Sequence, residues 1–134
     1  MKHKRLLTLL LLLAAAAAQA AVDDGILQGL TEPGALRVEL VSELRPLVIN
    51  RMHNWTIRLS APDGTPVDNA TFSVQGGMPL HNHGLPTQPL VTRNLGEGEY
   101  LLEGMRFHMP GQWELLLQID IDGAQEVIRL AFEL

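Results

Sequence analysis

Histidine and methionine occur together in three short segments of the chain beyond residue 20. The segments are Met52-His53, Met78 to His83 and Met105 to Met109, and every histidine of this part of the chain belongs to one of them. Imidazole nitrogen and thioether sulfur form a ligand set for copper, above all Cu(I), whereas Mg²⁺ and Ca²⁺ take oxygen ligands and structural zinc usually takes thiolate. The distribution therefore predicts a site for a soft metal ion.

The last two segments share one spacing, because residues 77–84 and 104–111 both have the pattern G-M-x-x-H-x-x-G. The first of them lies within residues 76–89, a stretch with three glycines and three prolines that predicts a loop rather than a regular central strand. If this loop is locally extended, His81 and His83 point to the same side and can reach one ion.

The second segment is expected to contribute fewer ligands. His108 and Met109 are adjacent, so in an ideal strand their side chains would face opposite ways, and Pro110 biases Met109 toward an extended conformation. We expect His108 to share the ion and Met105 to pack in the core. The predicted metal ligands are three histidines with a thioether in a weaker position: His81, His83 and His108, with Met78 or Met109.

A structural role fits Met52-His53 better. Alternation along residues 52–60 places His53 on the same strand face as Trp55, which we expect to be the core tryptophan. A structural role is also open for His81 and His83, whose rings can hydrogen-bond to loop backbone while the methionines fill gaps in the packing.

Other chemistry has little support in the sequence. A blue-copper centre needs a cysteine thiolate, and the chain has no cysteine. The three serines beyond residue 20 do not lie in a G-x-S-x-G turn, and no phosphate-binding glycine loop occurs. We therefore expect no enzymatic activity.

The N-terminal residues predict export. A basic start, Met1 to Arg5, precedes an apolar run that ends in Ala18-Gln19-Ala20, the pattern of a secretory signal peptide cleaved after Ala20. Removal of residues 1–20 would leave no stable membrane anchor, and the expected location is the periplasm. Since no cysteine is available for a disulfide, packing alone must stabilise the core.

Charge narrows the range of partners. Beyond residue 20 the chain has seven arginines, no lysine and fifteen acidic residues, a formal charge of −8. A surface with this balance argues against nucleic acid and anionic membranes as partners. The length of this part suits a single domain with one core.

The rest of the sequence has the pattern of an antiparallel all-β domain. Residues 21–35 are small, acidic and punctuated by glycine and proline, and we expect a flexible lead-in. Residues 36–134 predict an immunoglobulin-like antiparallel β-sandwich of about seven strands, with a hairpin at Asp122-Gly123. Tyr100 could tie a strand corner through its hydroxyl or be an ordinary core or rim aromatic. The expected strands are 36–42, 52–60, 71–75, 90–93, 100–103, 112–120 and 125–134.

Three stretches, residues 77–87, 98–100 and 104–113, together resemble the YtkA-like domain, a group related to FixH. The resemblance covers about residues 37–134. It implies a small exported or membrane-anchored immunoglobulin-like β-sandwich, with an M-P-x-H-x-H-G loop set beside an F-H-M-P-G-x-W strand. It also implies a role in copper handling or cytochrome oxidase assembly.

These observations predict a periplasmic metal-binding protein, a carrier or buffer for copper with Cu(I) as the favoured ion. Its partner would be an envelope protein that donates or accepts copper. The alternative is a metal-free accessory or protein-interaction module of the cell envelope, in which the His/Met loops form an adaptable contact surface.

Overall fold

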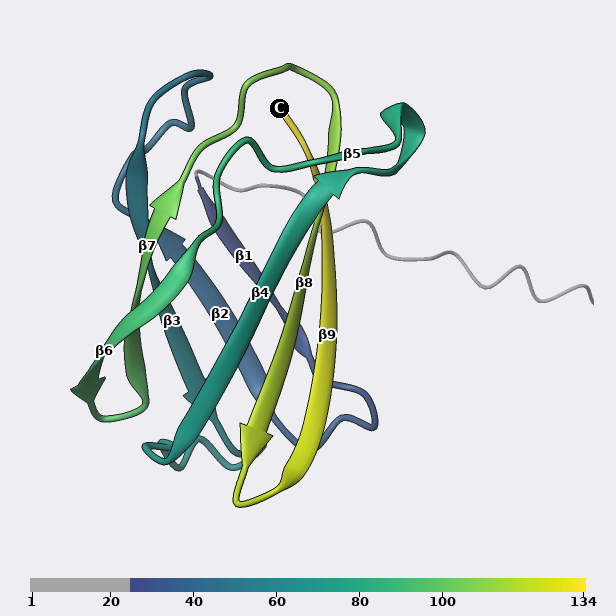
Figure 1. Cartoon of the computed structure of the whole chain (residues 1–134). Helices are drawn as coiled ribbons and strands as arrows, with labels where there is room; N and C mark the ends of the chain where they lie inside the picture. Colours follow the sequence, from purple (N-terminus) through teal and green to yellow (C-terminus); the bar gives the residue numbers. More distant parts are fainter. Residues whose placement is uncertain (1–24) are drawn as a thin grey trace, which may run out of the picture.

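The computed structural model describes residues 25–134, which form two antiparallel β-sheets packed face to face (Figure 1). One sheet has the strand order β1-β2-β3-β7-β6 and the other the order β5-β4-β8-β9. The predicted immunoglobulin-like β-sandwich is confirmed, with nine strands in the described residues instead of about seven. The elements are β1 (Ile26–Leu30), β2 (Arg37–Ser42), β3 (His53–Ser60), β4 (Ala70–Met78), the 3₁₀ turn η1 (Pro79–His81), β5 (His83–Gly84), β6 (Leu90–Gly96), β7 (Glu99–Met105), β8 (Gln112–Ile121) and β9 (Ala124–Glu133).

The predicted signal peptide, residues 1–20, lies outside the described residues, as does the start of the predicted lead-in. Within residues 25–134, no helix has the length and apolar character that crossing a membrane would require.

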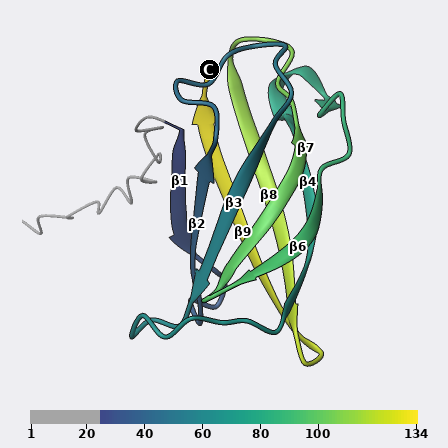
Figure 2. The same ribbon diagram turned by 90° about the vertical axis from the view of Figure 1, so that its left-hand side faces the viewer.

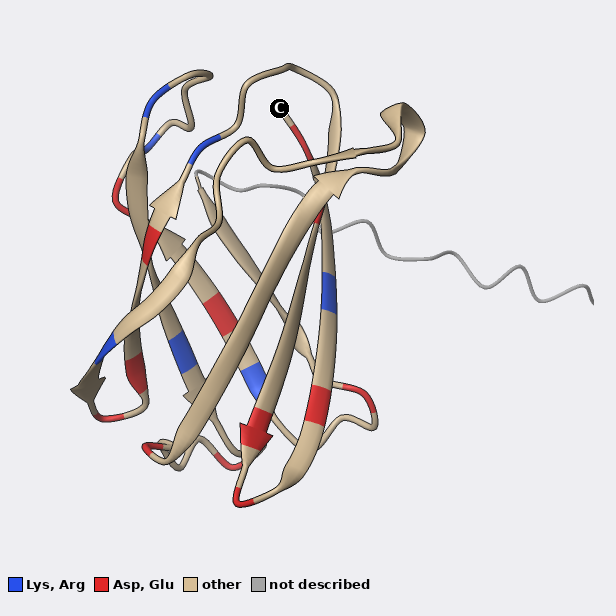
Figure 3. Cartoon of the chain, in the orientation of Figure 1, with Lys and Arg blue, Asp and Glu red and all other residues tan. Residues whose placement is uncertain are grey.

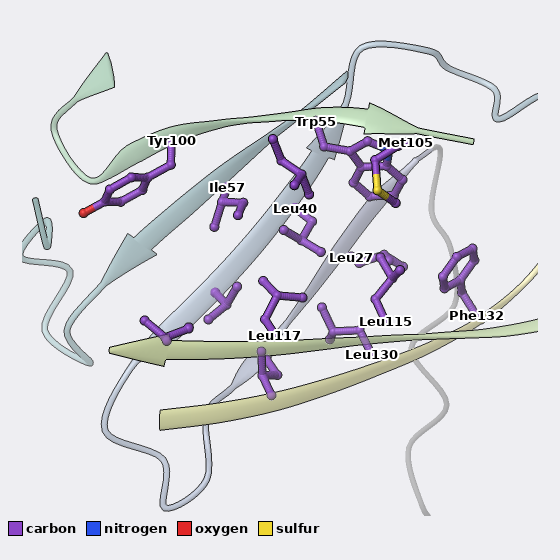
Figure 4. Packing of buried hydrophobic residues seen from close by; sticks show 14 of the residues in the cluster. Leu27, Leu40, Trp55, Ile57, Tyr100, Met105, Leu115, Leu117, Leu130 and Phe132 are labelled. Atoms are coloured by element: carbon purple, nitrogen blue, oxygen red, sulfur yellow. The ribbon is translucent and has the colours of Figure 1, made fainter. Parts of the chain in front are cut away.

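Alternation of apolar and polar residues determines which face each strand buries. In β3 every second residue from His53 to Leu59 is buried, and β8 follows the same rule from Trp113 onward. Because successive side chains of a strand point to opposite faces, each strand gives one row to the space between the sheets. Figure 4 shows Trp55 and Met105 side by side in this core, so both predictions of core packing are confirmed.

Strand β1 corrects the prediction for residues 21–35. Its residues pair with β2 at the edge of the larger sheet instead of forming a flexible lead-in. Leu27 is fully buried, and a Cβ at Gly29 would lie only 3.1 Å from Ile128 Cδ1 of β9. The missing side chain at Gly29 therefore lets this edge strand approach the opposite sheet. The sequence pattern missed the strand because glycine interrupts its short apolar run.

Strand β4 also extends beyond the predicted residues 71–75, through two glycines as far as Met78. A Cβ at Gly77 would lie 2.6 Å from the carbonyl oxygen of His83, so only glycine permits this approach of β5. The stretch predicted as a loop thus begins with a paired segment. The pairing places Met78 directly opposite His83.

The connections lie at two ends of the sandwich, which Figure 1 and Figure 2 show well apart. We call the upper end in Figure 1 the histidine end and the lower end the tyrosine end. The histidine end consists of segments 43–52, 79–89 and 106–111, and the tyrosine end of segments 61–69, 97–98 and 122–123.

Tyr100 closes the tyrosine end. Its hydroxyl donates a hydrogen bond to the carbonyl of Val67 at 2.6 Å and accepts one from the N–H of Ala70 at 3.2 Å. These bonds tie the connection between β3 and β4 to β7, so the tyrosine forms the strand corner. The hairpin at Asp122-Gly123 is confirmed as well, both residues having positive φ.

Candidate metal centre

His83 and His108 come together at the histidine end. His83 begins β5, and His108 lies in the segment between β7 and β8. The centroids of the two imidazole rings are 5.0 Å apart, and their planes are tilted by 47°. Two residues 25 positions apart in the sequence therefore face each other, as the prediction of a shared site required.

The hydrogen bonding of His83 defines its free nitrogen. Nδ1 lies 3.1 Å from the carbonyl oxygen of Gly84, and since a carbonyl only accepts, Nδ1 must carry the proton of the neutral ring. Nε2 is then left with its lone pair, buried and without a hydrogen-bond partner among the described residues. An imidazole held through one N–H by a backbone carbonyl is the usual arrangement of a metal-ligating histidine.

The Nδ1 atom of His108 is buried and unpartnered in the same way. Leaving one polar atom buried without a partner destabilises a fold by about 1 to 3 kcal/mol. One cation would satisfy both atoms in the tautomer of His108 that carries its proton on Nε2. The neighbouring core rings of His53 and Trp55 also carry unpartnered nitrogens, so the distinguishing property of this site is that both of its rings are imidazoles.

Met78 supplies a thioether on the same side of the smaller sheet. As the cross-strand partner of His83, it points to the same face of the pair β4–β5, and it is 0 % exposed. Its methyl group reaches the segment of His108, because a Cβ at Gly111 would lie 2.9 Å from Met78 Cε. The side chain therefore bridges the two segments that carry the histidines.

Met109 is half-buried and packs against the core cluster. Its carbonyl accepts a hydrogen bond from the indole N–H of Trp113 at 3.0 Å. Two backbone bonds between Gly111 and Leu134, of 2.8 and 3.0 Å, hold the same segment against the end of the chain. The structure thus gives Met109 a defined place in the packing next to His108.

His81 lies at the edge of this group. Residues 79–81 form the 3₁₀ turn η1 instead of the extended loop that the sequence suggested, and the side chain of His81 is exposed. Its ring centroid is 5.9 Å from that of His83. Among residues 25–134, no group of three or more His, Asp or Glu side chains is placed to hold a metal ion. The predicted convergence of three imidazoles is therefore not formed, and metal binding by the predicted ligands stays a prediction.

His53 lies on the core face of β3 beside Trp55, as expected, and is 7 % exposed. Its Nδ1 bonds to the carbonyl oxygen of Arg51 at 2.9 Å, and its Nε2 is buried without a partner. Burial lowers the pKa of His53 below the usual value. Among residues 25–134, its ring neighbours are Trp55 and Phe107 and not a second imidazole, which separates it from the pair at His83.

A hollow of about 430 Å³ opens beside His83 on the outer side of β4 and β8. Asn82 and Met78 line it, together with Glu114 and Arg129. The last two form an ion pair of 3.0 Å, so the carboxylate of Glu114 already has a partner. Of the two histidines of the pair, only His83 lines this hollow.

The segment that carries His83 has no charged side chain. Between Asp68 and Arg93 the chain contains no acidic residue, lysine or arginine, and Figure 3 shows η1 and β5 without a charged position. This segment therefore brings no charge of its own, while the ion-paired Glu114 and Arg129 lie at the hollow beside it.

Sequence reasoning did not predict Trp113 as a site residue. Its ring centroid lies 6.1 Å from that of His83 and 5.6 Å from that of His108, in edge-to-face geometry with both. The available signal was its position five residues after His108, but a tryptophan in an alternating strand is first expected in the core.

These features define a β-sandwich protein with a paired-histidine site, flanked by a thioether and an indole, at one end of the fold. A family model described as YtkA-like matches residues 31–118, and the chain belongs to this family. The matched region includes both segments that carry the histidine pair. No curated protein and no solved structure matches the chain.

Proposed function

We propose that this protein is a copper carrier or buffer of the periplasm that binds Cu(I) through His83 and His108. The observation that carries the proposal is the pair of buried, unpartnered imidazole nitrogens on rings 5.0 Å apart. Met78 adds a buried thioether, while His81 and Met109 form the outer part of the same ligand set.

The ligand chemistry favours a monovalent soft ion. Imidazole and thioether are neutral, and the carboxylate at the adjoining hollow, that of Glu114, is already ion-paired with Arg129 at 3.0 Å. An uncompensated charge in a low-dielectric site is unfavourable, and it is more so for a divalent ion than for a monovalent one. Thioether also binds Cu(I) well and zinc poorly.

The position of the site suits transfer of the ion by ligand exchange. His81 is exposed on η1, and its ring centroid is 5.9 Å from that of His83, so an incoming ligand would meet the site from the side of His81. A partner's ligand can therefore bind before those of this protein are released. We propose an envelope protein that donates or accepts copper as that partner.

The test is a titration of the purified protein with Cu(I), without oxygen and against a competing chelator. We expect one ion per chain and, in the His83→Ala/His108→Ala variant, an affinity at least about 100-fold weaker. The matched control is Met52→Ala, because Met52 is 59 % exposed and lies outside the proposed site, and it should bind as the wild type does. Unchanged affinity in the double variant would overturn the proposal.

One observation favours the second candidate, a metal-free interaction module. Leu80, at the middle of η1, is 79 % exposed, an unusual position for a large apolar side chain in so short a turn. If Cu(I) fails to bind more tightly than micromolar to the wild type, this function takes precedence.

A further inference from the structure

Three aromatic rings surround one point at the histidine end. The centroids of His83, His108 and Trp113 form a triangle with sides of 5.0, 5.6 and 6.1 Å. The point equidistant from these centroids lies about 3.2 Å from each of them, and an ion bonded to an imidazole nitrogen at about 2.0 Å lies roughly 3 Å from that ring's centroid. An ion at that point would be within bonding reach of both imidazoles and beside the indole.

The ring orientations suit such an ion. A metal ion lies in the plane of the imidazole that binds it, whereas a cation attracted by an indole lies over the ring face. The two imidazole planes are steep to the indole plane, at 67° for His83 and 74° for His108. The imidazole edges and the indole face can thus be directed at the same point.

Trp113 is held firmly in this position. Its N–H donates to the carbonyl of Met109 at 3.0 Å, and Phe107 packs against it with a centroid distance of 5.1 Å. The indole is 1 % exposed, so it also keeps water from its side of the site.

We propose that Trp113 is the aromatic wall of the metal site and a determinant of its specificity, an inference that rests on the proposed function. Its ring face contacts the bound ion through cation–π attraction, and its bulk keeps water and anionic ligands from that side. A monovalent soft ion is satisfied by two imidazoles, a thioether and this wall. A divalent ion, which needs further oxygen or nitrogen ligands, is disfavoured.

Fluorescence tests the contact without altering Trp113. The protein has two tryptophans, and the Trp55→Phe variant leaves Trp113 as the single indole. We expect Cu(I), and Ag(I) as a redox-inert probe, to quench most of the emission of this variant at one equivalent. In Trp113→Phe, where Trp55 is the emitter, quenching should be several-fold smaller. If Trp55→Phe does not fold, wild type and Trp113→Phe are compared directly, and equal quenching in the two contradicts the inference.

Selectivity tests the proposed role. We expect Trp113→Leu to weaken Cu(I) binding about 5- to 30-fold and Zn²⁺ binding little, and Trp113→Phe, which keeps a ring face, to lie between Trp113→Leu and the wild type. A purely structural tryptophan would instead weaken both ions alike. Equal losses for Cu(I) and Zn²⁺, with normal Cu(I) binding by the wild type, would overturn this inference alone, whereas no Cu(I) binding by the wild type would overturn the proposed function.

Discussion

The two ends of the sandwich differ in whether their buried polar groups have hydrogen-bond partners. At the tyrosine end, connecting residues are paired with backbone: Tyr100 bonds to two backbone groups, and the Asp68 carboxylate accepts the N–H of Gly98 at 2.6 Å. At the histidine end, nitrogens are left without partners. Of the six buried, unpartnered side-chain polar atoms in residues 25–134, four belong to residues in or next to the segments of the histidine end, and Trp55 lies two residues further along β3. The four residues are His53, His83, Arg106 and His108.

This difference separates structural from functional use of polar residues. Because burying an unpaired nitrogen is unfavourable, the two on the adjacent rings of His83 and His108 support the ligand proposed there. The tyrosine end shows that the same chain can pair the polar groups of a connection, as Tyr100 and Asp68 do. The predictions below compare the two ends, in order of decreasing effect.

Copper should stabilise the protein through the histidine end alone. At a free Cu(I) concentration about 1,000 times the Kd, the free energy of unfolding should rise by about 4 kcal/mol, because the ion binds only the folded state. The His83→Ala/His108→Ala variant should show almost none of this gain. Thermal unfolding with and without Cu(I) measures it, and an equal rise in both proteins would show that the ion binds elsewhere.

Tyr100→Phe should act on the tyrosine end without affecting metal binding. The variant leaves the Val67 carbonyl and the Ala70 N–H without their partner, so we expect a loss of about 2 kcal/mol in the free energy of unfolding. Urea denaturation measures this loss. A change of more than twofold in Cu(I) affinity would show that the ends are coupled.

Two buried methionines provide a matched pair at the histidine end. Met78 and Met105 are both fully buried, but only Met78 lies opposite His83. Met78→Leu keeps the apolar volume and removes the sulfur, so Cu(I) affinity should fall about tenfold, or about 1.4 kcal/mol. Met105→Leu should bind as the wild type does, and equal affinities in the two variants would remove the thioether from the site.

His53 should produce the smallest effect, a pH dependence of stability. Burial lowers its pKa in the folded state, so below about pH 6.5 the unfolded chain takes up a proton that the folded protein resists. Stability is therefore highest above pH 6.5 and declines as the pH falls toward the lowered pKa. His53→Leu should flatten this decline in urea denaturation between pH 7.5 and 5.5. If the variant keeps the wild-type slope of stability against pH, groups other than His53 cause the decline.

Local patterns predicted much of this protein. Alternation located β3, β8 and β9 to within a residue or two, and it placed His53 and Trp55 on the core face. It missed β1, and it ended β4 too early, because glycine breaks the pattern where a strand approaches another chain segment closely. Glycine is required at these positions by chain segments that are close in space but distant in the sequence, so the local pattern does not reveal it.

For the site, the sequence determined the chemistry of the ligands and the segments that carry them. The association of histidine with methionine and the absence of cysteine follow from composition alone. Only the tertiary structure decided which of these residues meet. It brought His83 to His108, placed His81 on an exposed 3₁₀ turn and set Trp113 against both rings. The physical reason is that ligand type is a property of single residues, whereas convergence depends on pairing between strands that are distant in the sequence.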